Sequence, residues 1–204
     1  IFQYQVFDQF LAGSSLQDSY NAVGAVANRW LDVLDTHGRD VPDEEMMELI
    51  SEKKTISKTL DDYDGRKATS LTTAVRLSDF LGAEMVKDKG LNCNLIISAY
   101  PRNAPVTDRA IPVAIFDADD NTRRHFLRKW LKEPDLDCED FRDLVDWSYY
   151  RERLSRSVQK IITIPAGLQA IVNPCPRVEH PKWLNKFLNE KLGRTKQLKL
   201  NDLF

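Results

Sequence analysis

The sequence predicts a mainly α, α+β fold, in which a helical lobe carries a small two-stranded β element. Three observations predict it. Apolar residues between Trp147 and Ile162 recur at the spacing of one helix face. Residues that cap helices precede several other segments of the chain. Two short runs, 91–99 and 110–116, are rich in apolar and β-branched residues, which favour strands.

The helices are predicted from the residues at their starts and ends. Ser15 is a good N-cap, and Asp18 follows three residues later in an arrangement close to a capping box. Ser70 is a second good N-cap, and the run after it ends before a glycine, as helices commonly do. Asp119 and Asp120 place acidic groups at a helix start, where the helix dipole favours them. In chain order, the predicted helices span residues 2–11, 16–36, 43–50, 71–81, 119–131 and 147–164.

The longest predicted helix follows Asp146 and ends at Pro165, because proline interrupts a helix. At about 100° per residue, six apolar or aromatic residues lie on one side: Trp147, Tyr150, Leu154, Val158, Ile161 and Ile162. Four others lie on the opposite side: Tyr149, Arg153, Arg156 and Lys160. The helix is therefore predicted to pack on a core and to present positive charge, although most charged stripes of this kind contact only water.

Composition is that of a soluble globular chain. The 204 residues suffice for one domain or one lobe of a larger protein, and 42% are hydrophobic and 29% charged. No apolar run approaches the roughly 20 residues that cross a bilayer, so no membrane partner is expected. Because the chain opens on Ile1, we expect it to be a segment of a longer polypeptide.

The cysteines and histidines do not predict a metal site. Cys93, Cys138 and Cys175 are widely separated and form no Cys-x-x-Cys pair, and His125 and His180 add no close spacing. Zinc ligands usually come in such close pairs. We therefore expect buried thiols rather than metal ligands or disulfides.

The net charge of −2 conceals an uneven distribution of charge along the chain. Acidic residues predominate over 32–64, whereas basic residues predominate over 177–202. A further basic cluster lies between residues 123 and 132. Phosphate binding depends on the local field rather than on total charge, so this distribution allows a nucleic-acid partner without proving one.

Many short stretches of the chain together match one family. They are Asp146-Trp147, Tyr149-Tyr150, Glu152-Arg153-Leu154, Gln159 to Ala166, Asn173-Pro174, Pro176 to Val178, His180-Pro181 and Trp183-Leu184, with Pro105 to Phe116 and Phe126 to Trp130 upstream. Through these residues the chain resembles the thumb subdomain, and the segment after it, of family B DNA polymerases of the epsilon type. The resemblance covers essentially the whole chain, which makes it far more specific than any short motif.

The resemblance implies a thumb-like lobe that grips primer–template duplex DNA through phosphate contacts and so supports processive synthesis. It implies that the intact polypeptide is a DNA-directed DNA polymerase, a nucleotidyltransferase, of the nucleus. The metal-binding carboxylates of such enzymes lie upstream in the palm, so no catalytic residue is expected here. Mg²⁺ and an iron–sulfur cluster are expected only elsewhere in the polypeptide. The expected protein partners are the palm and fingers of the same polypeptide and the other polymerase subunits.

The resemblance also implies which residues contact DNA. A helix start near Ser70 exposes backbone N–H groups that suit a phosphate oxygen, and in the family a lysine-containing turn lies beside it. The alternative for this segment is a plain capped helix with solvated lysines. The expected contacts are Ser57, Lys58, Lys67, Ser70, Arg153 and Lys160.

We expect residues 1–192 to form the thumb subdomain and residues 193–204 a basic tail. Four tail residues, Gln197, Leu200, Leu203 and Phe204, have the spacing of a sliding-clamp-binding peptide. One helical turn would place the apolar ones together as a plug for a hydrophobic pocket. Binding should be weak, because Leu203 stands where an aromatic residue is usual. The alternative is a tail that packs on its own domain.

Two functions of other classes also fit the residues. One is a non-enzymatic helical module that binds proteins and has a solvated basic face. The other is a stand-alone duplex-binding protein. The start on Ile1 disfavours both of these independent forms.

Overall fold

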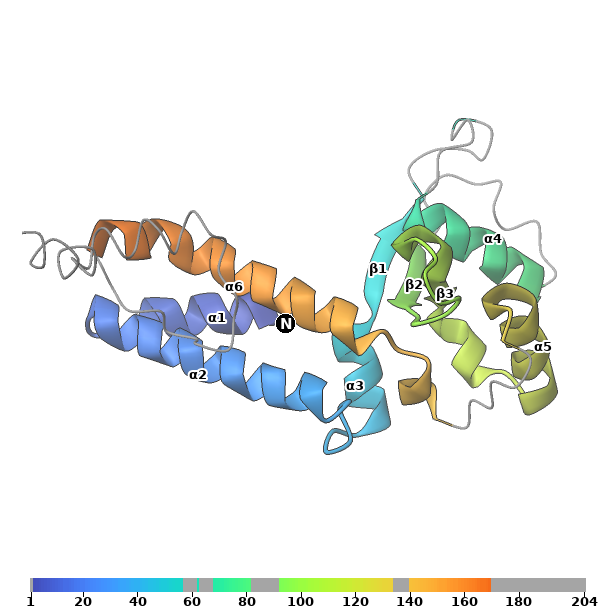
Figure 1. Ribbon diagram of the computed structural model, residues 1–204, viewed down its shortest axis with the longest axis horizontal. Helices are drawn as coiled ribbons and strands as arrows, with labels where there is room; N and C mark the ends of the chain where they lie inside the picture. The colour runs from blue at the N-terminus through green and yellow to red at the C-terminus, as the bar shows by residue number, and fades with distance from the viewer. Residues whose placement is uncertain (1, 57–61, 63–67, 82–91, 134–139, 170–204) are drawn as a thin grey trace, which may run out of the picture. The chain divides into compact units, whose positions relative to one another are not determined.

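The computed structural model describes residues 2–56, 62, 68–81, 92–133 and 140–169, the side chains of 16, 17, 81 and 159–169 excepted. The chain divides into two compact units (Figure 1). One unit contains residues 1–40 and 150–204, and the other contains residues 41–149. We call them the helical unit and the sheet unit.

The helical unit begins with two packed helices, α1 (Phe2–Ala12) and α2 (Leu16–Asp35). As predicted, Ser15 is the N-cap of α2, and its side chain accepts a hydrogen bond from the backbone N–H of Asp18 at 3.1 Å. Gly13 allows the tight connection, because a Cβ there would lie 2.1 Å from the Oγ of Ser19. Edge-to-face ring pairs, Phe2 with Trp30 and Phe10 with Tyr20, join the two helices. Their buried core residues include Val6, Tyr20, Val23, Ala27 and Leu31.

Helix α6 (Trp147–Gln169) starts in the sheet unit and continues into the helical unit. Leu154 and Val158 are buried, and the Nε of Arg151 lies 3.1 Å from the carboxylate of Asp35 at the end of α2. The predicted end at Pro165 is wrong, since the helix continues to Gln169. A proline inside a helix removes one backbone hydrogen bond, and the helical backbone continues past it here.

The sheet unit contains three antiparallel strands in the order β1-β2-β3, not the predicted two. They are β1 (Glu52–Thr55), β2 (Asn92–Ile97) and β3 (Ala110–Pro112). Strand β1 was missed because its sequence, Glu-Lys-Lys-Thr, has no apolar alternation. It joins the sheet by pairing its backbone with β2, with Glu52 opposite Leu95. The second predicted strand is shorter than expected, because the chain turns at Val113 into a 3-10 helix, η4 (Val113–Asp117).

The described part of the sheet unit also contains three α-helices. They are α3 (Asp43–Ile50), α4 (Thr69–Leu81) and α5 (Asp120–Leu131). Asp119 caps α5 as predicted, by accepting a hydrogen bond from the N–H of Thr122. The predicted N-cap role of Ser70 is wrong, because α4 already begins at Thr69. Helix α4 packs on β2 and β3. The buried core includes Ile56, Leu95, Ile96, Ile97, Ile111, Ile115, Leu127, Leu131 and Leu144.

The first turn of α6 is fastened to the sheet by Asp146. Its backbone N–H donates to the carbonyl of Ile97 at 3.0 Å, which continues the pairing between Ser98 and Val145. One carboxylate oxygen of Asp146 accepts a hydrogen bond from the N–H of Tyr149 at 3.0 Å, and the other forms an ion pair with Arg109. Asp146 therefore caps the helix and links it to the segment before β3.

Candidate nucleic-acid interface

The predicted phase of α6 is confirmed where its side chains are described. Trp147, Tyr150, Leu154 and Val158 are all buried. Arg153 lies on the opposite side and is exposed. Lys160 belongs to α6, but its side chain lies outside the described residues, as do those of Ile161 and Ile162.

Tyr149 and Arg156 belong to the same predicted side, and each contacts an acidic residue. The hydroxyl of Tyr149 donates to a carboxylate oxygen of Glu52 at 3.3 Å, and the Tyr149 side chain is half-buried rather than exposed. Arg156 is exposed and forms an ion pair with Glu152 one turn earlier. Its charge is therefore partly balanced within the helix. Arg153 is the other described cation of this side, and it is exposed.

Of the predicted contacts near the start of α4, the structure describes only Ser70. It lies in the first turn of that helix and is half-buried. Ser57, Lys58 and Lys67 lie outside the described residues. Ser70 belongs to the sheet unit and Arg153 to the helical unit, so the two described contacts come from different units. The tail residues Gln197, Leu200, Leu203 and Phe204 also lie outside the described residues.

Helix α5 presents a second basic surface, which the sequence indicated only as a cluster of charges. Arg124, Arg128 and Lys132 are exposed, and each follows the previous one after four residues. This spacing places them along one side of the helix and its C-terminal end. Lys132 ends the helix in the left-handed conformation, with φ of 57°.

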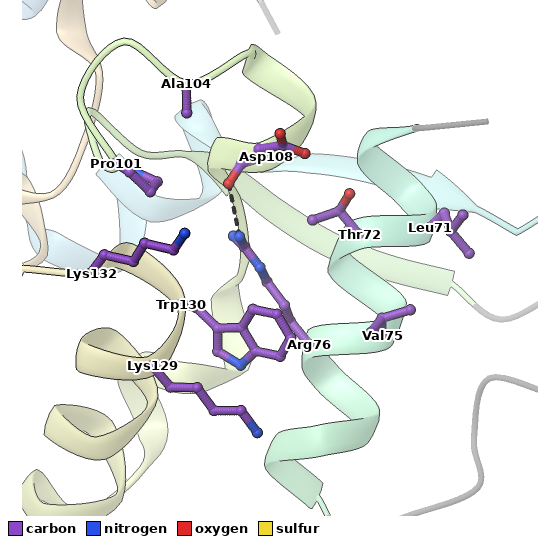
Figure 2. A pocket seen from close by; sticks show the side chains of 10 residues that line it. All are labelled: Leu71, Thr72, Val75, Arg76, Pro101, Ala104, Asp108, Lys129, Trp130 and Lys132. Atoms are coloured by element: carbon purple, nitrogen blue, oxygen red, sulfur yellow. Dashed lines mark hydrogen bonds between the residues drawn. The ribbon is translucent and has the colours of Figure 1, made fainter. Parts of the chain in front are cut away.

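A pocket opens beside this C-terminal end of α5 (Figure 2). Its volume is about 570 Å³, within the range of ligand sites. Side chains from α4, from the 101–108 segment and from the end of α5 line it: Leu71, Thr72, Val75, Arg76, Pro101, Ala104, Asp108, Lys129, Trp130 and Lys132. Sequence reasoning missed this pocket because its walls come from three segments far apart in the chain.

Arg76 forms the inner wall of the pocket and is 4% exposed. Its guanidinium donates to the carbonyl oxygens of Ala110 at 2.7 Å and Asp108 at 2.8 Å, and it lies 5.1 Å from the ring centre of Trp130. Burial lowers the pKa of Arg76 to about 10 even though the Asp108 carboxylate opposes the shift, so the group stays charged at neutral pH. Its buried Nε has no hydrogen-bond partner among the described residues.

Asp79 joins α4 to α5 by contacting two of the residues that line the pocket. Its carboxylate accepts hydrogen bonds from the Nζ of Lys129 at 2.6 Å and from the indole Nε1 of Trp130 at 3.1 Å. The bond from Lys129, with a smaller contribution from Trp130, lowers the pKa of Asp79 against the effect of burial. The pocket wall is therefore held by charged hydrogen bonds as well as by packing.

Within the described part of the chain, no three His, Cys, Asp or Glu side chains gather in a way that could hold a metal ion. Cys93 is buried in the core, and burial raises the pKa of its thiol. Among the same residues, no helix is both long and apolar enough to cross a membrane.

Residues 1–169 match the family model for the thumb domain of the DNA polymerase epsilon catalytic subunit. The chain belongs to this family of polymerase thumb domains. The expected resemblance to family B polymerases of the epsilon type is thereby confirmed, and so is the mainly helical fold class. The segment after residue 169 lies beyond the family model.

Relatives of known identity are similar in sequence along the entire chain. The DNA polymerase epsilon catalytic subunit of Emericella nidulans is 58% identical over 204 residues, which are 100% of this chain and 9% of the relative. The corresponding protein of Saccharomyces cerevisiae is 56% identical over 203 residues, and that of Arabidopsis thaliana is 50% identical over 205. This thumb domain thus spans about a tenth of the length of the relatives that it matches.

A solved structure supports the fold of this thumb domain independently of close sequence similarity. The family B DNA polymerase of the archaeon Pyrobaculum calidifontis matches it with a TM-score of 0.52 at 20% identity. The match covers 80% of this chain and 17% of the archaeal one. At that identity the similarity concerns the fold alone.

Proposed function

We propose that this thumb domain grips primer–template duplex DNA through contacts to backbone phosphates and thereby keeps the polymerase on its template. The observation that carries the proposal is the thumb-domain family match over residues 1–169. The exposed Arg153, opposite the buried stripe of α6, supports it by placing a cation where the predicted DNA face lies. Contacts to phosphate carry no base information, so the grip is independent of sequence.

In this proposal the chemistry belongs to the complete polypeptide. The complete polymerase performs template-directed nucleotidyl transfer in the nucleus, with the Mg²⁺-binding carboxylates in its palm and an iron–sulfur cluster in another part. The thumb domain supplies positioning and processivity, together with the palm and fingers and the other polymerase subunits. Ser57, Lys58, Lys67, Ser70, Arg153 and Lys160 are its proposed DNA contacts.

Single alanine substitutions in the complete polymerase test the grip. Lys58, Lys67, Arg153 and Lys160 are replaced one at a time, and products per binding event and duplex affinity are measured across salt concentrations. Each change should shorten the products, weaken binding equally on different sequences, and lower the salt slope by about one ion, because each phosphate contact releases about one counterion.

Arg39→Ala provides a matched control, because Arg39 is an exposed cation in the acid-rich segment outside the proposed face. It should leave processivity and the salt slope unchanged. If all four test variants behave like this control, the basic positions are merely solvated and the DNA-grip proposal fails. If the control is as damaging as the test variants, the effect reflects net charge rather than specific contacts.

We further propose that the tail residues Gln197, Leu200, Leu203 and Phe204 bind a sliding clamp. The support is their spacing, with the basic Arg194 just before them to assist encounter with an acidic clamp surface. A peptide of residues 194–204 should bind the matching clamp weakly, and the Leu200→Ala/Phe204→Ala peptide should not. Equal binding of both peptides, or none at high micromolar concentration, removes the clamp as a partner.

A further inference from the structure

The pocket beside α5 has two chemically different sides. Its apolar lining comes from two places, Leu71 and Val75 of α4 and Pro101 and Ala104 of the adjoining loop, and in Figure 2 Arg76 lies between them. Val75 is 39% exposed, and among the described residues of the sheet unit it is the large hydrophobic side chain left open to solvent. An exposed apolar side chain in a concave site marks a place where another apolar group can be buried.

The other side of the pocket is positively charged. Arg76, Lys129 and Lys132 line it together with the carboxylate of Asp108. The ammonium of Lys129 is paired with Asp79, so Arg76 and Lys132 supply most of the positive charge. Lys132 is exposed and its ammonium group points toward the middle of the pocket in Figure 2. The basic surface continues away from the pocket along α5 through Arg128 and Arg124. A ligand that follows this path meets positive charge on its way into the pocket.

Duplex DNA fits this combination poorly. A phosphodiester backbone has no bulky apolar side group to bury against Val75, Pro101 and Ala104, and a duplex is too wide to enter a cavity of about 570 Å³. Base stacking is also disfavoured at Trp130, because Arg76 and Lys129 lie 5.1 and 5.2 Å from its ring centre. A bulky apolar side chain flanked by carboxylates satisfies both sides of the pocket.

We propose that this pocket docks a short acidic protein segment that carries one bulky apolar residue. The apolar side chain packs against Leu71 and Val75, and its flanking carboxylates lie against Lys132 and the basic side of α5. Tryptophan and arginine in a concave site are the residue types that most often dominate the energy of protein interfaces. The proposal is independent of the DNA grip, because its residues are not among the proposed DNA contacts.

The test is a titration in which the complete polymerase is added to a fluorescein-labelled peptide, Glu-Asp-Glu-Phe-Glu-Asp-Glu, and binding is followed by fluorescence anisotropy. Two matched peptides accompany it, one with alanine for phenylalanine and one with lysine for every acid. The phenylalanine peptide should bind, the alanine peptide should bind about tenfold more weakly through lost apolar burial, and the lysine peptide should not bind.

Variants of the protein then locate the binding site. Lys132→Glu and Val75→Asp should each weaken the phenylalanine peptide about tenfold, by repelling its carboxylates. Lys53→Glu makes the same charge change as Lys132→Glu on an exposed strand residue outside the pocket, and should leave binding unchanged. Both pocket positions are exposed, so thermal unfolding of all three variants should match that of the unchanged protein.

Four results would overturn the proposal. They are no peptide binding at millimolar concentration, equal binding of the phenylalanine and alanine peptides, and equal weakening by Lys132→Glu and Lys53→Glu. The fourth is displacement of the peptide by short duplex DNA whose own affinity falls in Lys132→Glu and Val75→Asp, which would assign the pocket to DNA instead.

Discussion

At the scale of single residues, three buried or half-buried arginines connect parts of the sheet unit that are distant in sequence. Arg76 donates to two backbone carbonyls before and at the start of β3, Arg109 donates to the carbonyl of Ser98, and Arg142 donates to the carbonyl of Val41. A planar guanidinium with five donors suits this role, because it can satisfy several buried carbonyls at once. Each of these charges is also near a carboxylate, which limits the desolvation penalty.

The ion pair of Arg109 and Asp146 makes a prediction about pH. Burial tends to raise the pKa of Asp146, but hydrogen bonds from Arg109, Ser148 and the N–H of Tyr149 outweigh it and lower the pKa. A carboxyl whose folded-state pKa is lowered adds stability above its unfolded pKa of about 3.9 and loses it as pH falls through the folded value. Asp146→Asn should therefore destabilise the protein by about 3 kcal/mol at neutral pH, and the difference should shrink below about pH 4.

Urea unfolding at a series of pH values measures this effect. Asp143→Asn is the control, because Asp143 is an exposed acidic residue nearby. Its unfolding midpoint should follow that of the unchanged protein at every pH. A constant difference between Asp146→Asn and the unchanged protein down to pH 2 would show that the stabilisation does not depend on ionised Asp146.

At the scale of elements, two features define α6. Its buried face follows from a periodic sequence pattern, and its first residue is set by contacts with the sheet. The apolar stripe through Leu154 and Val158 is buried as its spacing predicted. The start of the helix is held by Asp146, whose backbone is already paired with the sheet. The buried face of α6 therefore follows from local periodicity. The exposed face does not follow from periodicity alone, because Tyr149 is half-buried and donates a hydrogen bond to Glu52.

Truncation of Leu154 tests the phase of α6. Leu154 is 7% exposed, so Leu154→Ala should lower the free energy of unfolding by about 2–5 kcal/mol through lost burial and the cavity left behind. Arg153→Ala, one residue earlier on the exposed side, should change it by less than about 0.5 kcal/mol. Denaturant unfolding of both variants measures the contrast, and similar losses in the two would mean that the assigned basic face is also incorrect.

At the scale of the whole molecule, the sheet unit is continuous in sequence whereas the helical unit is assembled from two separate stretches. Residues 41–149 contain the three strands, α3, α4 and α5, and a core of their own that includes Leu95, Ile96, Ile111 and Leu131. A continuous segment of this size with its own core meets the requirements of an independently folding unit.

We therefore predict that residues 41–149 fold when they are expressed alone. The isolated segment should unfold cooperatively on heating and give a dispersed amide NMR spectrum, because its buried contacts are internal to it. Ile96→Asp in the same segment is the control for packing, since Ile96 is fully buried and a carboxylate there would remain unpaired. A broad, non-cooperative transition in the unchanged segment would show that it needs the rest of the chain.

The sequence by itself determined the elements that have local signals. Helix caps at Ser15 and Asp119, the apolar periodicity of α6 and the apolar run of β2 all act within a few residues, so they can be read along the chain. The family was also evident from the sequence, because shared residues over the whole chain do not depend on coordinates.

Only the tertiary structure decided the features that depend on residues far apart in sequence. Strand β1 is polar and exists because β2 offers it backbone partners. The role of Arg76 depends on its contacts with Ala110 and Trp130, which are distant from it in sequence. The pocket that Arg76 lines is formed by three separate segments of the chain. Backbone pairing and concave sites arise from long-range contacts, which local propensity does not encode.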